Sequence, residues 1–198
     1  MNRVKLKKKA KALLKNNIWT YWQAMFLVFL IISVGDILLV LINQPSFAFV
    51  FSLFMAPLAI GFQRYWLNFV RGKDLSFKLL FSPYTNIVAI VLVHILVPLF
   101  TGLWTLLFII PGVIASFSYI QTPLVSADLG NKDPLFTIKR SKDLMKGRKW
   151  EYFILCLSFG GWIITGLFTL GISFIWVAPY IQTTLTLYYE QLTTSFKA

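Results

Sequence analysis

Six polar side chains that lie within apolar stretches are the residues whose types and spacing could do chemistry. Gln63, Gln121 and Gln182 each occur in a separate apolar stretch, and the tetrapeptide Tyr-Ile-Gln-Thr at 119–122 recurs at 180–183. An amide within lipid must find a hydrogen-bond partner, so these side chains should face other helices. They either form hydrogen bonds that hold helices together or line a polar cavity. The candidate cavity residues are Gln63, His94, Tyr119, Gln121, Tyr180 and Gln182.

His94 is the only histidine of the chain, and Pro98 follows it by about one helical turn. Proline has no N–H to donate, so the carbonyl of residue 94 is left without its usual helical partner. A polar pocket at this point would either be satisfied by structural hydrogen bonds or contact a proton or a ligand. No Cys, Asp or Glu lies at ligand spacing around His94, so we expect no metal site and no cofactor.

Asp36 is the one carboxylate well inside an apolar stretch. Counted from Trp19 at roughly 1.5 Å per residue, it lies near the outer headgroups rather than at the bilayer centre. It is either a solvated or paired structural residue or a group that handles ions or protons. An aspartic protease needs a second carboxylate beside the first, but Asp128 is predicted at the inner end of its span. Motifs of metalloproteases, redox proteins, nucleotide-binding proteins and hydrolases are absent too, so we expect that the chain is not an enzyme.

Basic residues gather in short segments that precede apolar stretches. In the segment 132–149, Asp133 is a suitable N-cap, and Pro134 suits the first helical position. A helical wheel places Leu135, Ile138, Leu144 and Met145 on one face and Lys139, Arg140, Asp143 and Lys146 on the other. Such segments either only orient the protein in the membrane or bind anionic lipid or a protein partner. The expected cytoplasmic basic surface consists of Lys7, Lys8, Lys9, Lys11, Lys139, Arg140, Lys142, Lys146, Arg148 and Lys149.

The composition is that of a membrane protein. The chain has 198 residues, of which 58% are hydrophobic and 13% charged, and its mean hydropathy is +0.72. A soluble domain has roughly 25% charged residues. The net charge of +12 could indicate nucleic-acid binding, but the Lys and Arg residues fall in groups that lie on one side if the spans alternate. This positive-inside pattern predicts that both termini are cytoplasmic, and it argues against nucleic-acid binding.

Six apolar stretches are each long enough to cross a bilayer core of roughly 30 Å as a helix. They predict an all-α polytopic membrane protein of six transmembrane helices, arranged as three hairpins that are each preceded by a cytoplasmic amphipathic helix. The expected spans are residues 19–42, 47–70, 86–110, 113–129, 150–170 and 172–193, with surface helices at 4–15, 74–81 and 132–147. The single domain, 1–198, then contains pseudo-repeats at about 4–71, 74–129 and 132–195. Small residues four apart, Cys156 with Gly160 and Gly161 with Thr165, predict close packing of the fifth span on a neighbour.

Three segments resemble a known family of bacterial integral membrane proteins. They are LWTLLFIIPGVIASFSYIQTPLVSADLGN at 103–131, IKRSKDLMKGRKWEYFILCLSFGGW at 138–162 and APYIQTTLTLYYEQL at 178–192. The chain is similar over essentially its whole length to the family catalogued as domain of unknown function 975, which occurs mainly in Gram-positive bacteria. The resemblance implies a multi-span protein of the cytoplasmic membrane. It implies no activity and no catalytic residue.

These observations predict a non-enzymatic multi-pass protein of the bacterial cell membrane. We expect an accessory, regulatory or self-protection component that contacts the lipid bilayer, anionic lipid at the cytoplasmic face and a membrane protein partner. The alternative is a small transporter or pore with a polar cavity lined by Gln63, Gln121, Gln182 and His94. A wet, continuous cavity would distinguish the transporter from the accessory protein.

Overall fold

The computed structural model describes residues 3–15, 17–42, 47–130 and 133–197. All regular secondary structure in these ranges is helical, so the predicted all-α class is confirmed. The elements are α1 (Arg3–Leu14), α2 (Ile18–Ile42), α3 (Phe47–Val70), α4 (Lys78–Phe81), the 3-10 helix η1 (Ser82–Asn86), α5 (Ile87–Leu107), α6 (Ile109–Tyr119), α7 (Thr122–Leu129), α8 (Pro134–Leu144), α9 (Lys149–Leu157), α10 (Gly160–Phe168) and α11 (Phe174–Lys197).

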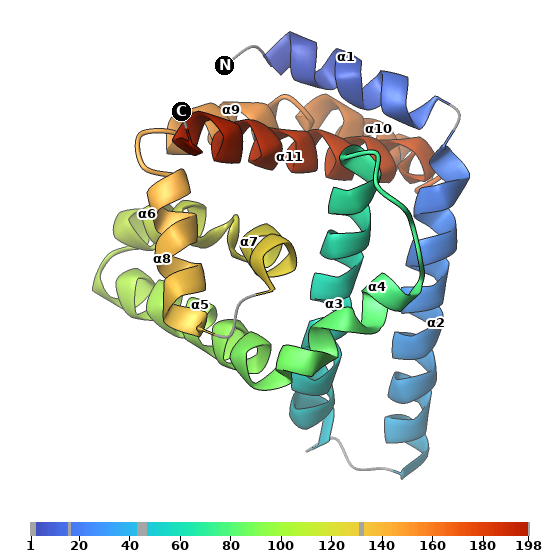
Figure 1. Cartoon of the computed structure of the whole chain (residues 1–198), viewed down its shortest axis with the longest axis vertical. Coiled ribbons are helices and arrows are strands. Elements are labelled where there is room, and N and C mark those ends of the chain that lie inside the picture. The colour runs from blue at the N-terminus through green and yellow to red at the C-terminus, as the bar shows by residue number, and fades with distance from the viewer. Residues whose placement is uncertain (1–2, 16, 43–46, 131–132, 198) are drawn as a thin grey trace.

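The long helices α2 and α3 form an antiparallel hairpin that projects from one side of the molecule (Figure 1). Helices α9, α10 and α11 lie across the end of this hairpin at which α3 finishes, and α1 covers them (Figure 1). Helices α5 and α6 form a second hairpin, against which α8 packs, while α7 contacts both α3 and α8. The end of the α2–α3 hairpin is therefore where the N-terminal and C-terminal parts of the chain meet.

Four stretches of the described residues are long and apolar enough to cross a membrane. They are Ile18–Leu41, Phe47–Val70, Lys78–Leu107 and Ile109–Leu129, which overlap the first four predicted spans. The fifth predicted span is divided into α9 and α10, with a turn between Leu157 and Gly160. Helix α11 is long enough, but polar residues alternate with its apolar ones. The six-span arrangement therefore stays a prediction.

Prolines place several helix ends elsewhere than predicted. The turn expected at Pro111 lies at Phe108, whose backbone is extended, and Pro111 falls within the first turn of α6, where its missing N–H is not needed. Pro123 likewise lies in the first turn of α7, so the predicted fourth span consists of two helices with a break at 120–121. The surface helix predicted at 74–81 is only α4, and the chain continues as η1, which has Pro83 near its start.

Both basic surface helices form, and α8 buries three of the four residues predicted for its apolar face, Ile138, Leu144 and Met145. Leu6, Ala10 and Leu14 of α1 are buried, and this helix packs against α11. The predicted N-cap of α8 is confirmed, since the Asp133 carboxylate accepts hydrogen bonds from the backbone N–H groups of residues 135 and 136 at 2.9 and 3.2 Å. Leu135, however, is 59% exposed.

Polar side chains take part in the buried face of α8. Thr137 and Ser141 are buried there together with Ile138, Leu144 and Met145. The Ser141 hydroxyl donates a hydrogen bond of 2.9 Å to the Ser118 carbonyl of α6, which removes the cost of burying it. The helix is consequently rotated relative to the predicted face, and Leu135 lies on its outer side.

The buried core lies at the end of the α2–α3 hairpin and is rich in aromatic side chains. Trp66 is fully buried, and the Tyr21 ring meets its ring edge-on at 4.9 Å between centroids. Large apolar side chains are exposed at the hairpin tips instead, where Leu106 and Leu170 are 85% and 94% exposed. Exposed apolar surface on this scale is typical of a protein that contacts lipid.

Two glycines allow helices to touch backbone to backbone. A Cβ at Gly61 of α3 would meet the backbone of Leu80 in α4, with only 2.7 Å to the Leu80 Cα, and a Cβ at Gly112 would lie 2.7 Å from the Thr105 Cα. The predicted close packing at Gly160 and Gly161 is wrong for this chain, since a Cβ at either position meets nothing within 4 Å among the described residues. Helix period alone does not show which small residues face a neighbour.

Gly61→Ala should therefore destabilise the fold, whereas Gly102→Ala in α5 should not. The added methyl group at Gly61 forces α3 and α4 apart, which costs roughly 1–3 kcal/mol in well-packed sites. A Cβ at Gly102 meets nothing within 4 Å, and alanine is a better helix former by roughly 1 kcal/mol. Thermal unfolding of the purified proteins in mild detergent measures both effects. Equal unfolding temperatures for the two variants would contradict the backbone contact.

Candidate functional site

A cavity of about 540 Å³ lies between α3, α5, α6 and the start of α7. We call it the α3–α5 cavity. Residues at helical spacing on α3 form one wall, from Ala56 to Gln63, and residues from Ile90 to Thr101 on α5 form another. Of the six candidate cavity residues, Gln63, His94 and Tyr119 line it. These three come from α3, α5 and α6, so the predicted spans two, three and four meet here.

The glutamines of α3 and α11 bind each other. The Gln182 amide nitrogen donates a hydrogen bond of 2.7 Å to the Gln63 side-chain oxygen. Gln121 is 1% exposed and does not line the cavity, and its side-chain oxygen has no hydrogen-bond partner among the described residues. Tyr180 lies elsewhere, with its ring 5.7 Å from that of Phe159. The structure thus gathers four of the six candidates, Gln182 through its bond to Gln63, and leaves Gln121 and Tyr180 apart.

The two aspartates compared in the sequence lie in different surroundings. Asp36 is exposed on α2. Asp128, near the C-terminal end of α7, accepts hydrogen bonds from Arg71 at 2.6 Å and from the Tyr189 hydroxyl at 2.9 Å. Within the described ranges, no three His, Cys, Asp or Glu side chains lie close enough together to hold a metal ion.

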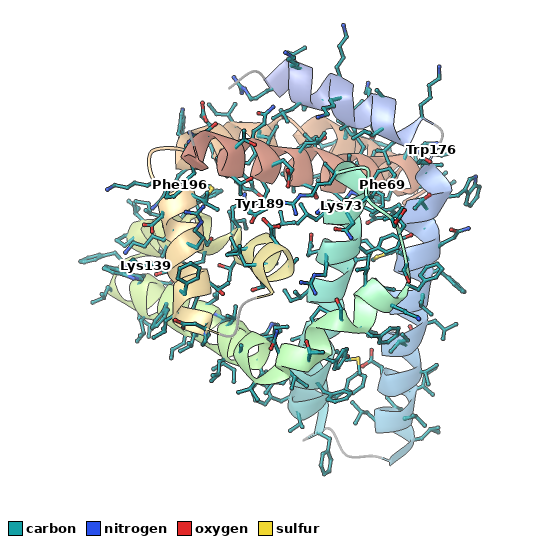
Figure 2. The ribbon with its side chains drawn as sticks, in the orientation of Figure 1. Phe69, Lys73, Lys139, Trp176, Tyr189 and Phe196 are labelled. Carbon is teal, nitrogen blue, oxygen red and sulfur yellow. The ribbon has the colours of Figure 1, made fainter. Side chains whose placement is uncertain are left out.

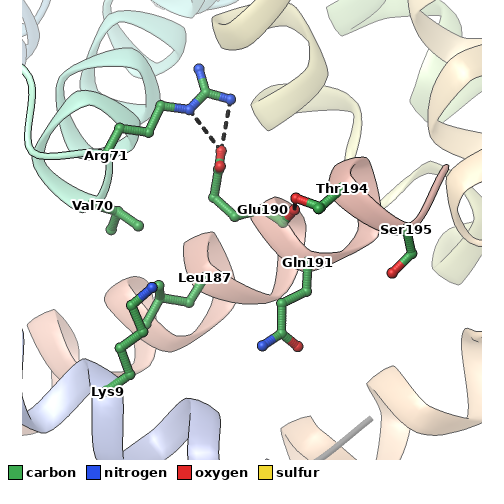
Figure 3. Close-up of a pocket in the computed structure, with 8 residues that line it drawn as sticks. All are labelled: Lys9, Val70, Arg71, Leu187, Glu190, Gln191, Thr194 and Ser195. Atoms are coloured by element: carbon green, nitrogen blue, oxygen red, sulfur yellow. Dashed lines mark hydrogen bonds and ion pairs between the residues drawn. The ribbon is translucent and has the colours of Figure 1, made fainter. Parts of the chain in front are cut away.

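Arg71 joins three helices at the end of the α2–α3 hairpin. Besides Asp128 of α7, its guanidinium binds the Glu190 carboxylate of α11, with Nε–Oε1 and Nη2–Oε1 distances of 2.8 and 2.7 Å (Figure 3). Burial alone would lower the pKa of Arg71, but the hydrogen bonds and charges of both carboxylates outweigh it and raise the pKa. The guanidinium therefore stays charged, and the three side chains form one ionic cluster.

A second arginine of α3 binds the same end of α7. The Arg64 Nε donates to the Ala127 carbonyl at 3.0 Å, and its Nη1 donates to the Ser82 hydroxyl of η1 at 2.9 Å. A cation at the C-terminal end of a helix interacts favourably with the helix dipole and with carbonyls that lack helical partners. Asn86 adds a hydrogen bond of 3.0 Å to the Gly130 carbonyl. The two arginines and Asn86 thus fix where α7 ends.

The sequence did not predict this cluster, because its Lys and Arg residues were considered only for orientation in the membrane and for contacts with lipid or a partner. A signal was present. Arg71 and Glu190 are 119 residues apart, and so are Gln63 and Gln182. A search for complementary pairs at a constant separation would have proposed both contacts.

The expected basic surface consists of exposed and half-buried cations. Lys7 of α1 donates to the Ser158 carbonyl at 3.2 Å and lies 4.5 Å from the centre of the Phe159 ring, and Arg140 lies 3.9 Å from the centre of the Phe196 ring. Burial, with the charges of Arg3 and Lys11, lowers the pKa of Lys7. The exposed members are Lys8, Lys9, Lys11, Lys139, Lys142 and Lys146, while Lys7, Arg140, Arg148 and Lys149 are half-buried.

Polar residues also surround a second cavity, of about 590 Å³, beside the ionic cluster (Figure 3). Lys9 of α1, Arg71 and Glu190 line it, together with uncharged residues of α3 and α11. The positive charges of Lys9 and Arg71 are balanced by the carboxylate of Glu190, which lines the cavity, and by that of Asp128, which binds Arg71 but does not line the cavity. This charge balance does not select an anionic ligand.

Arg71→Gln should destabilise the protein by roughly 1–3 kcal/mol, because it removes the shared cation from two partly buried carboxylates. Lys73→Gln, which changes an exposed cation two residues later, should have almost no effect. Asp128→Asn should cost less in the Arg71→Gln background than in the natural chain, since coupled residues are not additive. Chemical or thermal unfolding in detergent measures these differences. Additive effects would show that the cluster does not act as a unit.

Comparison with known proteins assigns a family to the C-terminal part of the chain. No curated protein and no solved structure matches it. One family model does match, over residues 106–195, which include α7, α8 and most of α11 and hence Asp128 and Glu190. The resemblance predicted from the sequence is confirmed over this part, rather than over the whole length. Residues 106–195 therefore match the model of the family described as Protein of unknown function (DUF975).

Proposed function

We propose that this chain is a non-enzymatic multi-pass protein of the bacterial cytoplasmic membrane. It acts as an accessory, regulatory or self-protection component through contacts with lipid and with a membrane protein partner. One observation supports this proposal above the others, and it is the outer face of α8. Leu135 and Phe136 are 59% and 48% exposed there, and the exposed Lys139, Lys142 and Lys146 follow them.

The spacing of these residues is that of a surface helix in a membrane interface. Leu135, Lys139, Lys142 and Lys146 succeed one another at three or four residues, so they share one side of α8. Apolar side chains next to lysines on an exposed helix face are typical of helices that lie on anionic lipid. Figure 2 places Lys139 on the outer side of the molecule. We therefore assign the lipid-contacting surface to α8.

Helix α1 has a different role in this proposal. Its apolar face is buried against α11, and Lys7 and Lys11 lie over aromatic rings of the C-terminal helices. It therefore fastens the N-terminus to α10 and α11 through protein contacts. Its other exposed lysines, Lys8 and Lys9, add to the charge of the cytoplasmic surface.

The proposed topology has six spans in three hairpins, with both termini and all three surface helices in the cytoplasm. The four apolar helical stretches support the first two hairpins, and the segment 149–197 supplies the third. The grouping of Lys and Arg residues supports the orientation. A small transporter is the competing function, and the α3–α5 cavity is the observation in its favour. Solute flux through proteoliposomes would favour the transporter.

Cysteine labelling in intact cells tests the topology. In a Cys156→Ala background, Ser46→Cys should react with a membrane-impermeant maleimide added from outside, because the connection at 43–46 is short and polar and lies between two spans. Lys142→Cys should react only after the membrane is permeabilised. The opposite pattern would reverse the orientation, and external reaction at both positions would rule out the proposed topology.

Neutralising the outer face of α8 should weaken the binding of anionic lipid. Each lysine near an anionic surface contributes about 1 kcal/mol, so the triple change of Lys139, Lys142 and Lys146 to glutamine should lower the affinity for phosphatidylglycerol by up to about a hundredfold. The same three changes to arginine keep the charge and serve as the matched control. Native mass spectrometry of the protein with phosphatidylglycerol, at low and high salt, measures bound lipid. Equal lipid binding by both triple variants would contradict the assigned surface.

A further inference from the structure

The α3–α5 cavity has the size and lining of a site for an apolar ligand. Its volume of about 540 Å³ falls within the roughly 300–1,000 Å³ of small-molecule sites. Alanine, isoleucine, valine and proline side chains supply most of its walls, and none of the Lys, Arg, Asp or Glu residues that the structure describes lines it. An anionic group inside it would therefore lack a cation, which is unfavourable away from water. The cavity selects an uncharged and mainly apolar molecule.

Hydrogen-bond donors on its walls select a polar group on that molecule. Thr122 lines the cavity and is 1% exposed, and its hydroxyl has no hydrogen-bond partner among the described residues. A buried hydroxyl without a partner is costly, so a ligand that satisfies it gains affinity. Gln63 accepts a hydrogen bond from Gln182, which leaves its amide nitrogen as a donor, and the Tyr119 hydroxyl can donate too. A ligand oxygen that accepts hydrogen bonds would fit these donors.

The surroundings of the cavity identify the source of the ligand. Several lining residues are exposed, including Ala59, His94 and Ile120, so the cavity is open to the outside of the protein. Next to them on α5, Leu92, Ile95 and Leu99 are exposed apolar residues. Both α3 and α5 belong to stretches that can cross a membrane. In the proposed membrane location, the opening would face the hydrocarbon region of the bilayer, from which a lipid chain could enter sideways.

We propose that the α3–α5 cavity binds an acyl chain of a membrane glycerolipid, with the ester carbonyl of that chain accepting hydrogen bonds from Thr122, Gln63 or Tyr119. This proposal rests on the proposed membrane location, and it names a lipid site distinct from the basic face of α8. The ester carbonyl is an uncharged acceptor, which agrees with the donors and with the lack of charged residues in the lining. A free fatty acid would bring a carboxylate that this lining does not neutralise.

Photocrosslinking with a phosphatidylcholine that carries a diazirine in its acyl chain tests the proposal. The protein is incubated in mild detergent with a limiting amount of this probe and irradiated, and the labelled peptides are identified by mass spectrometry. Labelling should concentrate in residues 56–63, 87–101 and 116–123 and should saturate. Unlabelled diacylglycerol should compete at least tenfold better than palmitic acid. Labelling that spreads over α2 and α10 without saturation, or better competition by palmitic acid, would overturn the proposal.

Two pairs of variants locate the site within the cavity. Ala59→Phe fills the cavity and should reduce the labelling of these peptides at least fivefold, whereas Ala48→Phe, on the same helix but outside the cavity, should not. Thr122→Val removes the unpaired hydroxyl with little change in shape and should reduce labelling about three- to tenfold. Thr165→Val, at an exposed position of α10, is its control. Unchanged labelling in Ala59→Phe and Thr122→Val would overturn the assignment.

Failure of the cavity proposal can be distinguished from failure of the proposed function. Phosphatidylcholine carries no net charge, so the triple glutamine variant of α8 should label as the natural chain does. If cavity labelling fails while phosphatidylglycerol binding by α8 persists, the lipid site in the cavity is wrong and the proposed function stands. If both fail and external cysteine labelling contradicts the topology, the membrane proposal itself is wrong.

Discussion

Arg71 leaves the end of α3 and binds Asp128 of α7 and Glu190 of α11, so one guanidinium holds three helices from distant parts of the chain. A partly buried cation needs both geometry and hydrogen bonds to offset the loss of hydration. These helices must therefore meet at the end of the α2–α3 hairpin, and the aromatic core around Trp66 lies there too. The hairpin tips are free of this constraint, and they expose apolar side chains instead.

The position of α7 follows from the same interactions and determines the shape of the α3–α5 cavity. Arg64 and Arg71 hold the C-terminal turn of α7, while Pro123 sets its start. A short helix that is fixed at one end keeps its first residues, including Thr122, beside α3 and α5. Had α6 continued straight through 120–121 as the predicted fourth span, Thr122 would be one more residue of a long helix. The break is what places Thr122 at the start of α7, in the cavity wall.

The sequence predicted which segments are helical better than which side of each helix is buried. Their approximate places on the chain, the N-cap of α8 and the amphipathic character of α1 could be predicted, because caps and polar–apolar contrast are local signals. The rotation of α8 could not, since it depends on the hydrogen bond of Ser141 to another helix. Helices such as α2 are apolar all round, and their pattern cannot distinguish a side that contacts protein from a side that contacts lipid. Which of the six candidate cavity residues line the α3–α5 cavity depends on which side of each helix contacts protein.

Contacts at constant sequence separations relate the ionic cluster to the predicted pseudo-repeat. Gln63 binds Gln182 and Arg71 binds Glu190 at the same separation of 119 residues, and Asp128 binds Tyr189 at 61, the separation of the repeated Tyr-Ile-Gln-Thr. Corresponding positions meet where repeated units pack around a common axis, so these pairs are what a pseudo-repeat predicts. Gln121 departs from the pattern, because the chain breaks at 120–121 and this residue takes the N-cap position of α7. Asp128 instead joins the predicted middle unit to the other two units, through Arg71 and Tyr189.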